Sequence, residues 1–193
     1  MNDESKTSGS IVKEFILEFI KILIISLAIV IPIRYFLIQP FYVKGASMEP
    51  NFHDYEYLII DEISFRFREP QRGEIIVFHS PYKWSDYYIK RIIGLPKERI
   101  VIKDGDVYIY NEKFKEGIKL DESNYLPAGV KTAGSIDLSL GENEYFVMGD
   151  NRNSSLDSRS FGAINRSQII GRTWIRGWPI FRIKKFEIPL YNL

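Results

Sequence analysis

The chain has 193 residues, of which 45% are hydrophobic and 15% aromatic. That is enough to bury one substantial core, or one domain with an added anchor. The formal net charge of +1 gives no support for nucleic acid as a partner. The chain contains no cysteine, which excludes disulfides, thiolate catalysis and cysteine-based metal sites.

An apolar segment at 15–38 is the first element that the sequence predicts. A helix of roughly 24 residues spans the hydrocarbon core of a bilayer. We therefore predict a single-pass transmembrane anchor at 15–38, preceded by a cytoplasmic segment at 1–14. A cleaved signal peptide is the alternative, but the run is long and the small residues Gly45, Ala46 and Ser47 lie well beyond its end.

The basic residues around this segment favour one orientation. Lys6, Lys13 and Lys21 lie on the N-terminal side, against Arg34 and Lys44 on the other. Under the positive-inside rule this places the N-terminus in the cytoplasm and the remainder of the chain outside the plasma membrane.

After residue 38 the pattern changes to short runs of Val, Ile, Tyr and Phe separated by turn residues, which is typical of strands. The runs occupy 41–43, 56–60, 74–79, 87–93, 145–148 and 169–177. Asp104-Gly105 between alternating apolar residues predicts a hairpin over 100–110. The more polar segment 111–140 is expected to leave the sheet. We predict a mainly β domain at 39–193, outside the membrane.

Ser47, in the stretch VKGASMEP at 43–50, is a candidate nucleophile that needs a base. The chain has two histidines, and neither is a good candidate. His53 lies too near in sequence, because it would have to fold back over Pro50 to reach the hydroxyl. His53 and His79 also lack the spacing of a zinc site, so no metal or cofactor is predicted.

Lys90, in YYIKRIIGLP at 87–96, is the alternative base. In a strand, Tyr88, Lys90 and Ile92 point to one side, so burial of that side would desolvate the amine. Burial can lower the pKa of a lysine by several units from about 10.4, and the neutral amine can then accept a serine proton. A lysine extended along the surface, or paired with a carboxylate, is the competing interpretation.

A third stretch, MGDNRNSSLDSRSFG at 148–162, combines small polar residues with paired charges. This composition predicts a fixed, hydrogen-bonded loop, although a surface turn with ion pairs has the same composition.

Taken in order, SMEP, YIKRIIGLP and GDNR followed by SLDSR resemble the bacterial type I signal peptidase family. The resemblance implies a membrane-anchored β domain that removes N-terminal signal peptides from secreted preproteins. It implies Ser47 as the nucleophile, with its backbone N–H as an oxyanion donor, and Lys90 as the base. It also implies that Ser155 hydrogen-bonds to Lys90 and orients it. Other residues would brace the site, namely Arg91, Asp150, Arg152, Asp157 and Arg159.

Substrate contacts follow from the expected geometry. An extended peptide can add as a strand beside the segment containing Phe41, with pockets for alternate side chains. Candidate pocket residues, for which core packing is the alternative, are Phe41, Val43, Phe52, Tyr88 and Ile89. Small pockets would favour alanine one and three positions before the cut. Trp178 and the basic region from 159 onward suggest contact with membrane phospholipids.

Some positions depart from the commonest family pattern. Gly45 stands where some members carry a serine that helps to bind the oxyanion, so the N–H of Ser47 must contribute more here. The other departures are Asn51-Phe52, Lys97-Glu98 and Asn153-Ser154.

Two other functions remain open from the sequence. A self-cleaving repressor-type peptidase would carry a DNA-binding domain where this chain has its apolar run. A membrane-tethered binding module without activity would require that the pair formed by Ser47 and Lys90, the proposed catalytic dyad, be degenerate.

Overall fold

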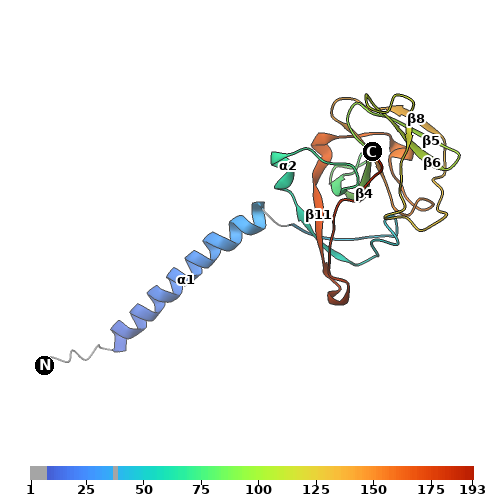
Figure 1. The fold of residues 1–193 in the computed structure, drawn as a ribbon. Helices are drawn as coiled ribbons and strands as arrows, with labels where there is room; N and C mark the ends of the chain where they lie inside the picture. Colours follow the sequence, from blue (N-terminus) through green and yellow to red (C-terminus); the bar gives the residue numbers. More distant parts are fainter. Residues whose placement is uncertain (1–7, 37–38) are drawn as a thin grey trace. The chain divides into compact units, whose positions relative to one another are not determined.

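The computed structural model describes residues 8–36 and 39–193 (Figure 1). The chain divides into two compact units, Met1–Ile38 and Gln39–Leu193. The first unit contains helix α1 (Ser8–Phe36), and the second contains two antiparallel sheets and several short helices.

Helix α1 coincides with the apolar segment of the sequence, and apolar side chains such as Phe15 and Phe19 are exposed along it. Within the described residues, no helix is both long and apolar enough to cross a membrane. The described residues therefore do not support the predicted anchor at 15–38. Residues 1–7 of the predicted cytoplasmic segment, and residues 37–38 of the predicted anchor, lie outside the described residues.

An eight-stranded antiparallel sheet forms the main body of the second unit. Its path runs β1-β2-β11-β3-β4-β9-β10, and β12 pairs with β11. The strands are β1 (Gln39–Tyr42), β2 (Tyr57–Asp61), β3 (Ile75–His79), β4 (Tyr87–Gly94), β9 (Glu144–Met148), β10 (Ile164–Asn165), β11 (Ile169–Trp178) and β12 (Lys184–Lys185). In this sheet β1 is an edge strand, whereas β4 lies between β3 and β9.

A four-stranded sheet in the order β7-β6-β5-β8 forms beside it. Its strands are β5 (Arg99–Lys103), β6 (Asp106–Tyr110), β7 (Ile118–Lys119) and β8 (Ile136–Ser139). Asp104 and Gly105 join β5 to β6 with φ values of +54° and +82°, as a two-residue hairpin turn requires. The predicted hairpin is confirmed, and the segment 111–140 leaves the large sheet to supply β7 and β8.

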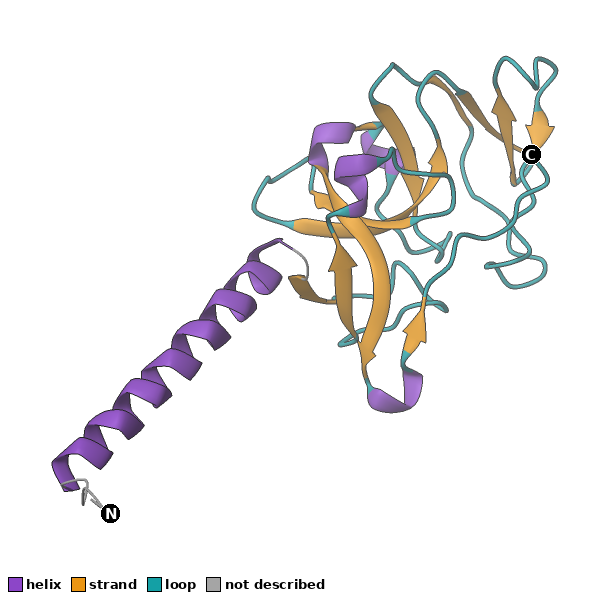
Figure 2. Cartoon of the chain, turned by 60° about the vertical axis from the view of Figure 1, so that its left-hand side comes forward, coloured by secondary structure: helices purple, strands orange, loops and turns teal. Residues whose placement is uncertain are grey.

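Short helices lie at the ends of strands, and Figure 2 shows them against the strands. They are α2 (Ser64–Phe67), α3 (Ser158–Phe161), η1 (Arg166–Gln168) and η2 (Ile180–Arg182). η2 connects β11 to β12. Asp157 caps α3 by accepting a hydrogen bond from the backbone N–H of Arg159, which fixes the end of the loop predicted at 148–162.

Three apolar clusters hold the second unit together, and the prediction of a mainly β fold is confirmed. One cluster lies directly beneath the turn that carries Ser47 and includes Val43, Met48, Phe52 and Leu58. Met48 is 1% exposed, so the residue that follows Ser47 is fixed in the core and holds the turn in place.

Candidate active site

Ser47 lies in the turn that follows β1, where local contacts fix the backbone. Gly45 has a φ of +89°, and its N–H donates to Asp54 Oδ1 at 2.9 Å. The N–H of Glu49 donates to Ala46 O at 3.1 Å. Only glycine adopts such a φ at little cost, so Gly45 allows the chain to turn just before the serine.

Lys90 lies within β4, where it is opposite Ile76 of β3. Its side chain is 4% exposed, and its Nζ donates to Ser47 Oγ at 2.7 Å and to Ile89 O at 2.9 Å. Burial lowers the pKa of Lys90 to about 8, although the negative charges of Asp157 and Asp150 act in the opposite direction. The structure thus brings together the two residues predicted to form a dyad, and the amine is desolvated as its strand position predicted.

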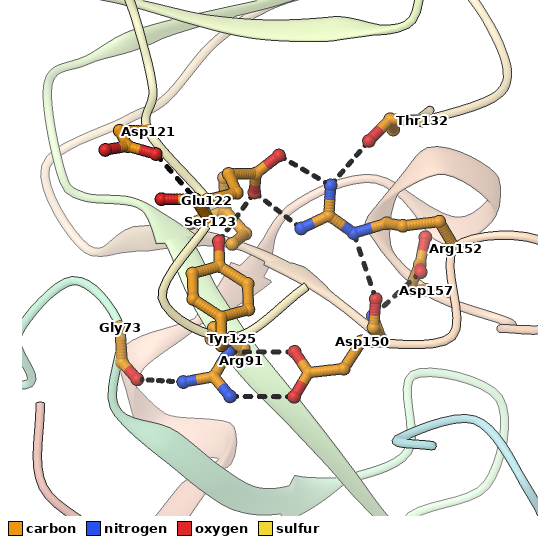
Figure 3. Close-up of polar contacts among 12 residues, drawn as sticks. Gly73, Arg91, Asp121, Glu122, Ser123, Tyr125, Thr132, Asp150, Arg152 and Asp157 are labelled. Carbon is orange, nitrogen blue, oxygen red and sulfur yellow. Dashed lines mark hydrogen bonds and ion pairs between the residues drawn. The ribbon is translucent and has the colours of Figure 1, made fainter. Parts of the chain in front are cut away.

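Arg91 points away from Lys90, because successive side chains of a strand alternate between faces. Its guanidinium donates to both carboxylate oxygens of Asp150, at 2.8 and 2.7 Å, and to Gly73 O at 2.8 Å (Figure 3). Its Cζ also lies 4.1 Å from the ring centroid of Tyr125. Arg91 and Asp150 are both buried, so this pair connects the strand that carries Lys90 to the loop at 148–162.

A second ion pair shapes the same loop. Arg159 donates to Asp157 through Nε at 2.9 Å and through Nη2 at 2.8 Å. The N–H of Gly149 donates to Asp157 Oδ2 at 3.0 Å. Burial alone would raise the pKa of Asp157, but these hydrogen bonds outweigh it and lower the pKa. Asp157 therefore stays ionised and holds the two ends of the loop together.

Arg152 is the third buried guanidinium of the loop. It donates to both carboxylate oxygens of Glu122, to the hydroxyl of Thr132 and, at 3.2 Å, to Gly149 O. All five predicted bracing residues are therefore in buried or half-buried ion pairs around the segment 149–159.

Ser155 does not make the predicted hydrogen bond to Lys90. Its Oγ is buried and has no partner with hydrogen-bond geometry among the described residues. It lies against Gly149, where an added Cβ would come 2.2 Å from Ser155 Oγ and 2.3 Å from Ser47 O. Ser155 is thus brought to the site by packing against Gly149, and its hydroxyl is among the groups that lower the pKa of Asp157.

The backbone N–H of Ser47 makes no hydrogen bond within the described residues. It is therefore available as an oxyanion donor. The N–H of Gly45 is already bound to Asp54, so it does not replace the donor that a serine side chain would supply at that position.

A cavity of about 250 Å³ opens beside the dyad. Four predicted pocket residues line it with Ser47 and Lys90: Phe41, Val43, Tyr88 and Ile89. The sequence analysis did not identify the other lining residues, which are Tyr42, Lys44, Leu58, Val77, Tyr87 and Leu156.

Phe52 was wrongly predicted as a pocket residue. It is fully buried and stacks on Phe186 with ring centroids 4.4 Å apart. The turn after Ser47 directs this side chain into the apolar cluster beneath the site, so it has no surface left for a substrate.

The two histidines do not line this cavity. His53 lies 3.5 Å from Glu49, and His79 stacks on Trp84. Among the described residues, no group of three histidine, cysteine, aspartate or glutamate side chains is placed to hold a metal ion.

Comparison with known proteins identifies the family. The family model described as signal peptidase, peptidase S26, matches residues 16–178. The chain belongs to this family. It is 34% identical to signal peptidase I of Bacillus licheniformis over 97% of this chain and 100% of that protein. It is also 34% identical to probable signal peptidase I-2 of Synechocystis, over 95% of this chain and 83% of the relative.

Two further similarities are a staphylococcal relative and a solved structure. Signal peptidase IB of Staphylococcus aureus is 29% identical over 89% of this chain and 94% of its own length. A crystal structure of a signal peptidase I from Enterococcus faecalis is 31% identical, with a TM-score of 0.44, and covers 54% of this chain and 97% of its own. The family model and the curated relatives confirm the resemblance that the three sequence motifs indicate.

Two residues that the sequence analysis did not name as site residues contact the turn that carries Ser47 or the loop beside it, and one of them, Asn151, belongs to the GDNR motif. Asn151 donates from its backbone N–H to Ser47 O and from its side chain to Ala46 O, both at 3.1 Å. Asn51 donates from Nδ2 to Asp150 Oδ2 and to Tyr125 O, both at 2.8 Å. The sequence signals for these contacts were the place of Asn151 in GDNR and the departure at Asn51 from the usual family residue.

Proposed function

We propose that the chain is a serine endopeptidase that removes N-terminal signal peptides from preproteins, with Ser47 as nucleophile and Lys90 as general base. The observation that carries this proposal is the 2.7 Å contact between Lys90 Nζ and Ser47 Oγ at a buried amine whose pKa is lowered to about 8. Membership of the signal peptidase family supports the substrate class.

The chemistry follows from this pair. In the neutral form of Lys90, the hydroxyl of Ser47 donates to Nζ, and the proton moves to the amine as Oγ attacks the scissile carbonyl carbon. The backbone N–H of Ser47 stabilises the negative charge that develops on the carbonyl oxygen. The ammonium of Lys90 then protonates the leaving amine. Lys90, neutral again, activates the water that hydrolyses the acyl-enzyme.

The position of β1 accounts for how a peptide could bind. As an edge strand, β1 leaves one side free of ladder hydrogen bonds, and an extended peptide can pair with it. The cavity beside the dyad is lined by Phe41, Val43 and Ile89, which suits small apolar side chains near the cut. This geometry supports a preference for alanine one and three residues before the scissile bond.

We place this activity at the outer face of the plasma membrane, in contact with phospholipids. The ribbon of β11, η2 and β12 supports this, because Trp178, Ile180 and Phe181 are exposed along it, next to the basic pair Lys184 and Lys185. Aromatic and apolar side chains beside lysines are suited to the boundary between head groups and acyl chains.

The test is incubation of the purified full-length chain with a preprotein in detergent, followed by mass determination of the products. We expect one cut after a small residue, and none with Ser47→Ala. His53→Ala combined with His79→Ala should retain cleavage. Cleavage of the chain itself in place of the preprotein would favour the repressor-type alternative, and an inert wild type would favour the binding module.

A further inference from the structure

A partly buried polar network joins Tyr125 and Arg152 to Glu122, which lies at its centre (Figure 3). Glu122 belongs to the segment 111–140, outside the family motifs. Its Oε1 accepts from the hydroxyl of Tyr125 at 2.6 Å and from Arg152 Nη2 at 2.5 Å. Its Oε2 accepts from Arg152 Nη1 at 2.8 Å.

Both partners of Glu122 lead towards the dyad. Arg152, whose side chain is fully buried, donates to Gly149 O, and its own carbonyl accepts from Arg159 at 2.7 Å. The ring of Tyr125 covers the guanidinium of Arg91, the residue next to Lys90. Glu122 thus contacts the loop directly through Arg152, and it contacts the strand that carries Lys90 indirectly, through Tyr125 and Arg91.

The loop segment held by Arg152 contacts the nucleophile directly. Gly149 packs against Ser47 O so closely that a Cβ there would come within 2.3 Å of it. Asn151 donates to Ser47 O and to Ala46 O. A shift of 149–152 would therefore move the backbone that sets the direction of the serine hydroxyl and of its N–H.

The charges in this region form three pairs. The guanidiniums of Arg91, Arg152 and Arg159 each face one carboxylate, from Asp150, Glu122 and Asp157 respectively. Lys90 and Lys44 both line the cavity, and the charges of Asp157 and Asp150, from two of these pairs, act on Lys90. Removal of the Glu122 charge alone would leave one uncompensated guanidinium in a region of low dielectric.

We propose that Glu122 is a positioning residue for the dyad: through Arg152 and Tyr125 it fixes the segment 149–152 against Ser47 and balances the charges around Lys90. This inference rests on the proposed function for its kinetic readout. Glu122 does not line the cavity beside the dyad, so it should affect kcat and leave KM within about twofold.

Two substitutions separate geometry from charge. Glu122→Asp keeps the charge but shortens the side chain, so it should lower kcat about tenfold and leave the pH profile in place. Glu122→Gln keeps the shape but removes the charge. The excess positive charge should then lower the pKa of Lys90, and the rise of kcat/KM with pH should move down by roughly half a pH unit.

Asp106→Asn is the matched control. Asp106 lies in the small sheet and pairs with Lys119 and Lys131, so the substitution makes the same charge change without touching Arg152. It should leave both kcat and the pH profile unchanged. If the rise of kcat/KM with pH moves equally in Asp106→Asn and in Glu122→Gln, the proposal is overturned, because the effect then follows the net charge of the chain.

A second readout does not depend on cleavage. The 13Cε resonance of Lys90, assigned by its loss in Lys90→Arg, reports the pKa of the amine by NMR titration of the full chain in detergent. We expect a lower pKa in Glu122→Gln and the wild-type pKa in Glu122→Asp. If wild type cleaves no preprotein, the proposed function fails, and the titration still decides the role of Glu122. The positioning role of Glu122 would be overturned by an unchanged pKa of Lys90 in Glu122→Gln, or by a kcat within twofold of wild type in Glu122→Asp.

Discussion

Cleavage of a preprotein by this chain should become faster as pH rises through the pKa of Lys90 and then reach a plateau. The neutral amine is the form that can accept the serine proton, so activity belongs to the deprotonated enzyme. Burial lowers that pKa to about 8. We therefore expect the rise of kcat/KM to be centred near pH 8.

The structure gives the size of the effect. With a pKa of about 8, about 9% of Lys90 is neutral at pH 7. With the ordinary value of 10.5, the neutral fraction at pH 7 would be about 0.03%. Desolvation of this one amine thus raises the concentration of competent enzyme about 300-fold at neutral pH.

The assay is the initial rate of cleavage between pH 6 and 10.5 at substrate concentrations below KM. Lys90→Arg serves as the matched variant, because it keeps a cation that does not deprotonate at any working pH. It should be inactive throughout. A rate that still climbs through pH 10 in the wild type, or substantial activity in Lys90→Arg, would refute the assignment of Lys90 as the base.

The remaining predictions concern packing and topology. Gly149→Ala should reduce cleavage at least tenfold and destabilise the fold by about 1–3 kcal/mol, because its Cβ would meet Ser47 O at 2.3 Å; wild-type kinetics would contradict this. Phe52→Leu should lower the free energy of unfolding by about 1 kcal/mol and leave the cleavage position unchanged, since Phe52 is fully buried. A changed cleavage position would show that Phe52 contacts the substrate. Protease added to intact spheroplasts should digest the β domain without lysis, and digestion only after lysis would contradict the outer-face location.

The residues that could be predicted are those whose role follows from a local pattern. Lys90 alternates with apolar and aromatic neighbours in a run of strand formers, so its strand and its burial were both accessible from sequence. The hairpin at Asp104-Gly105 likewise needs only local turn chemistry. These predictions depend on a few consecutive residues, and the structure agrees with them.

The errors and omissions involve contacts between distant segments. Glu122 reaches Arg152, 30 positions away, and Asn51 reaches Asp150, 99 positions away. No periodicity encodes such partners, because they depend on how the two sheets pack. Phe52 is an apolar residue close to Ser47 in sequence, and which side of that turn faces the core depends on the strands beneath it. The orientation of the Ser155 hydroxyl is a rotamer choice that sequence does not specify.

The arrangement of charges explains how the pKa of a buried lysine can be lowered beside two carboxylates. Asp150 and Asp157 both act to raise the pKa of Lys90, and unpaired they would favour the ammonium. Each is instead held by a guanidinium through two hydrogen bonds, Asp150 by Arg91 and Asp157 by Arg159. Because these cations offset the carboxylates at close range, desolvation remains the dominant influence on the amine. The ion pairs therefore do more than brace the loop, since they let the carboxylates order the backbone around Ser47 while the pKa of Lys90 stays lowered.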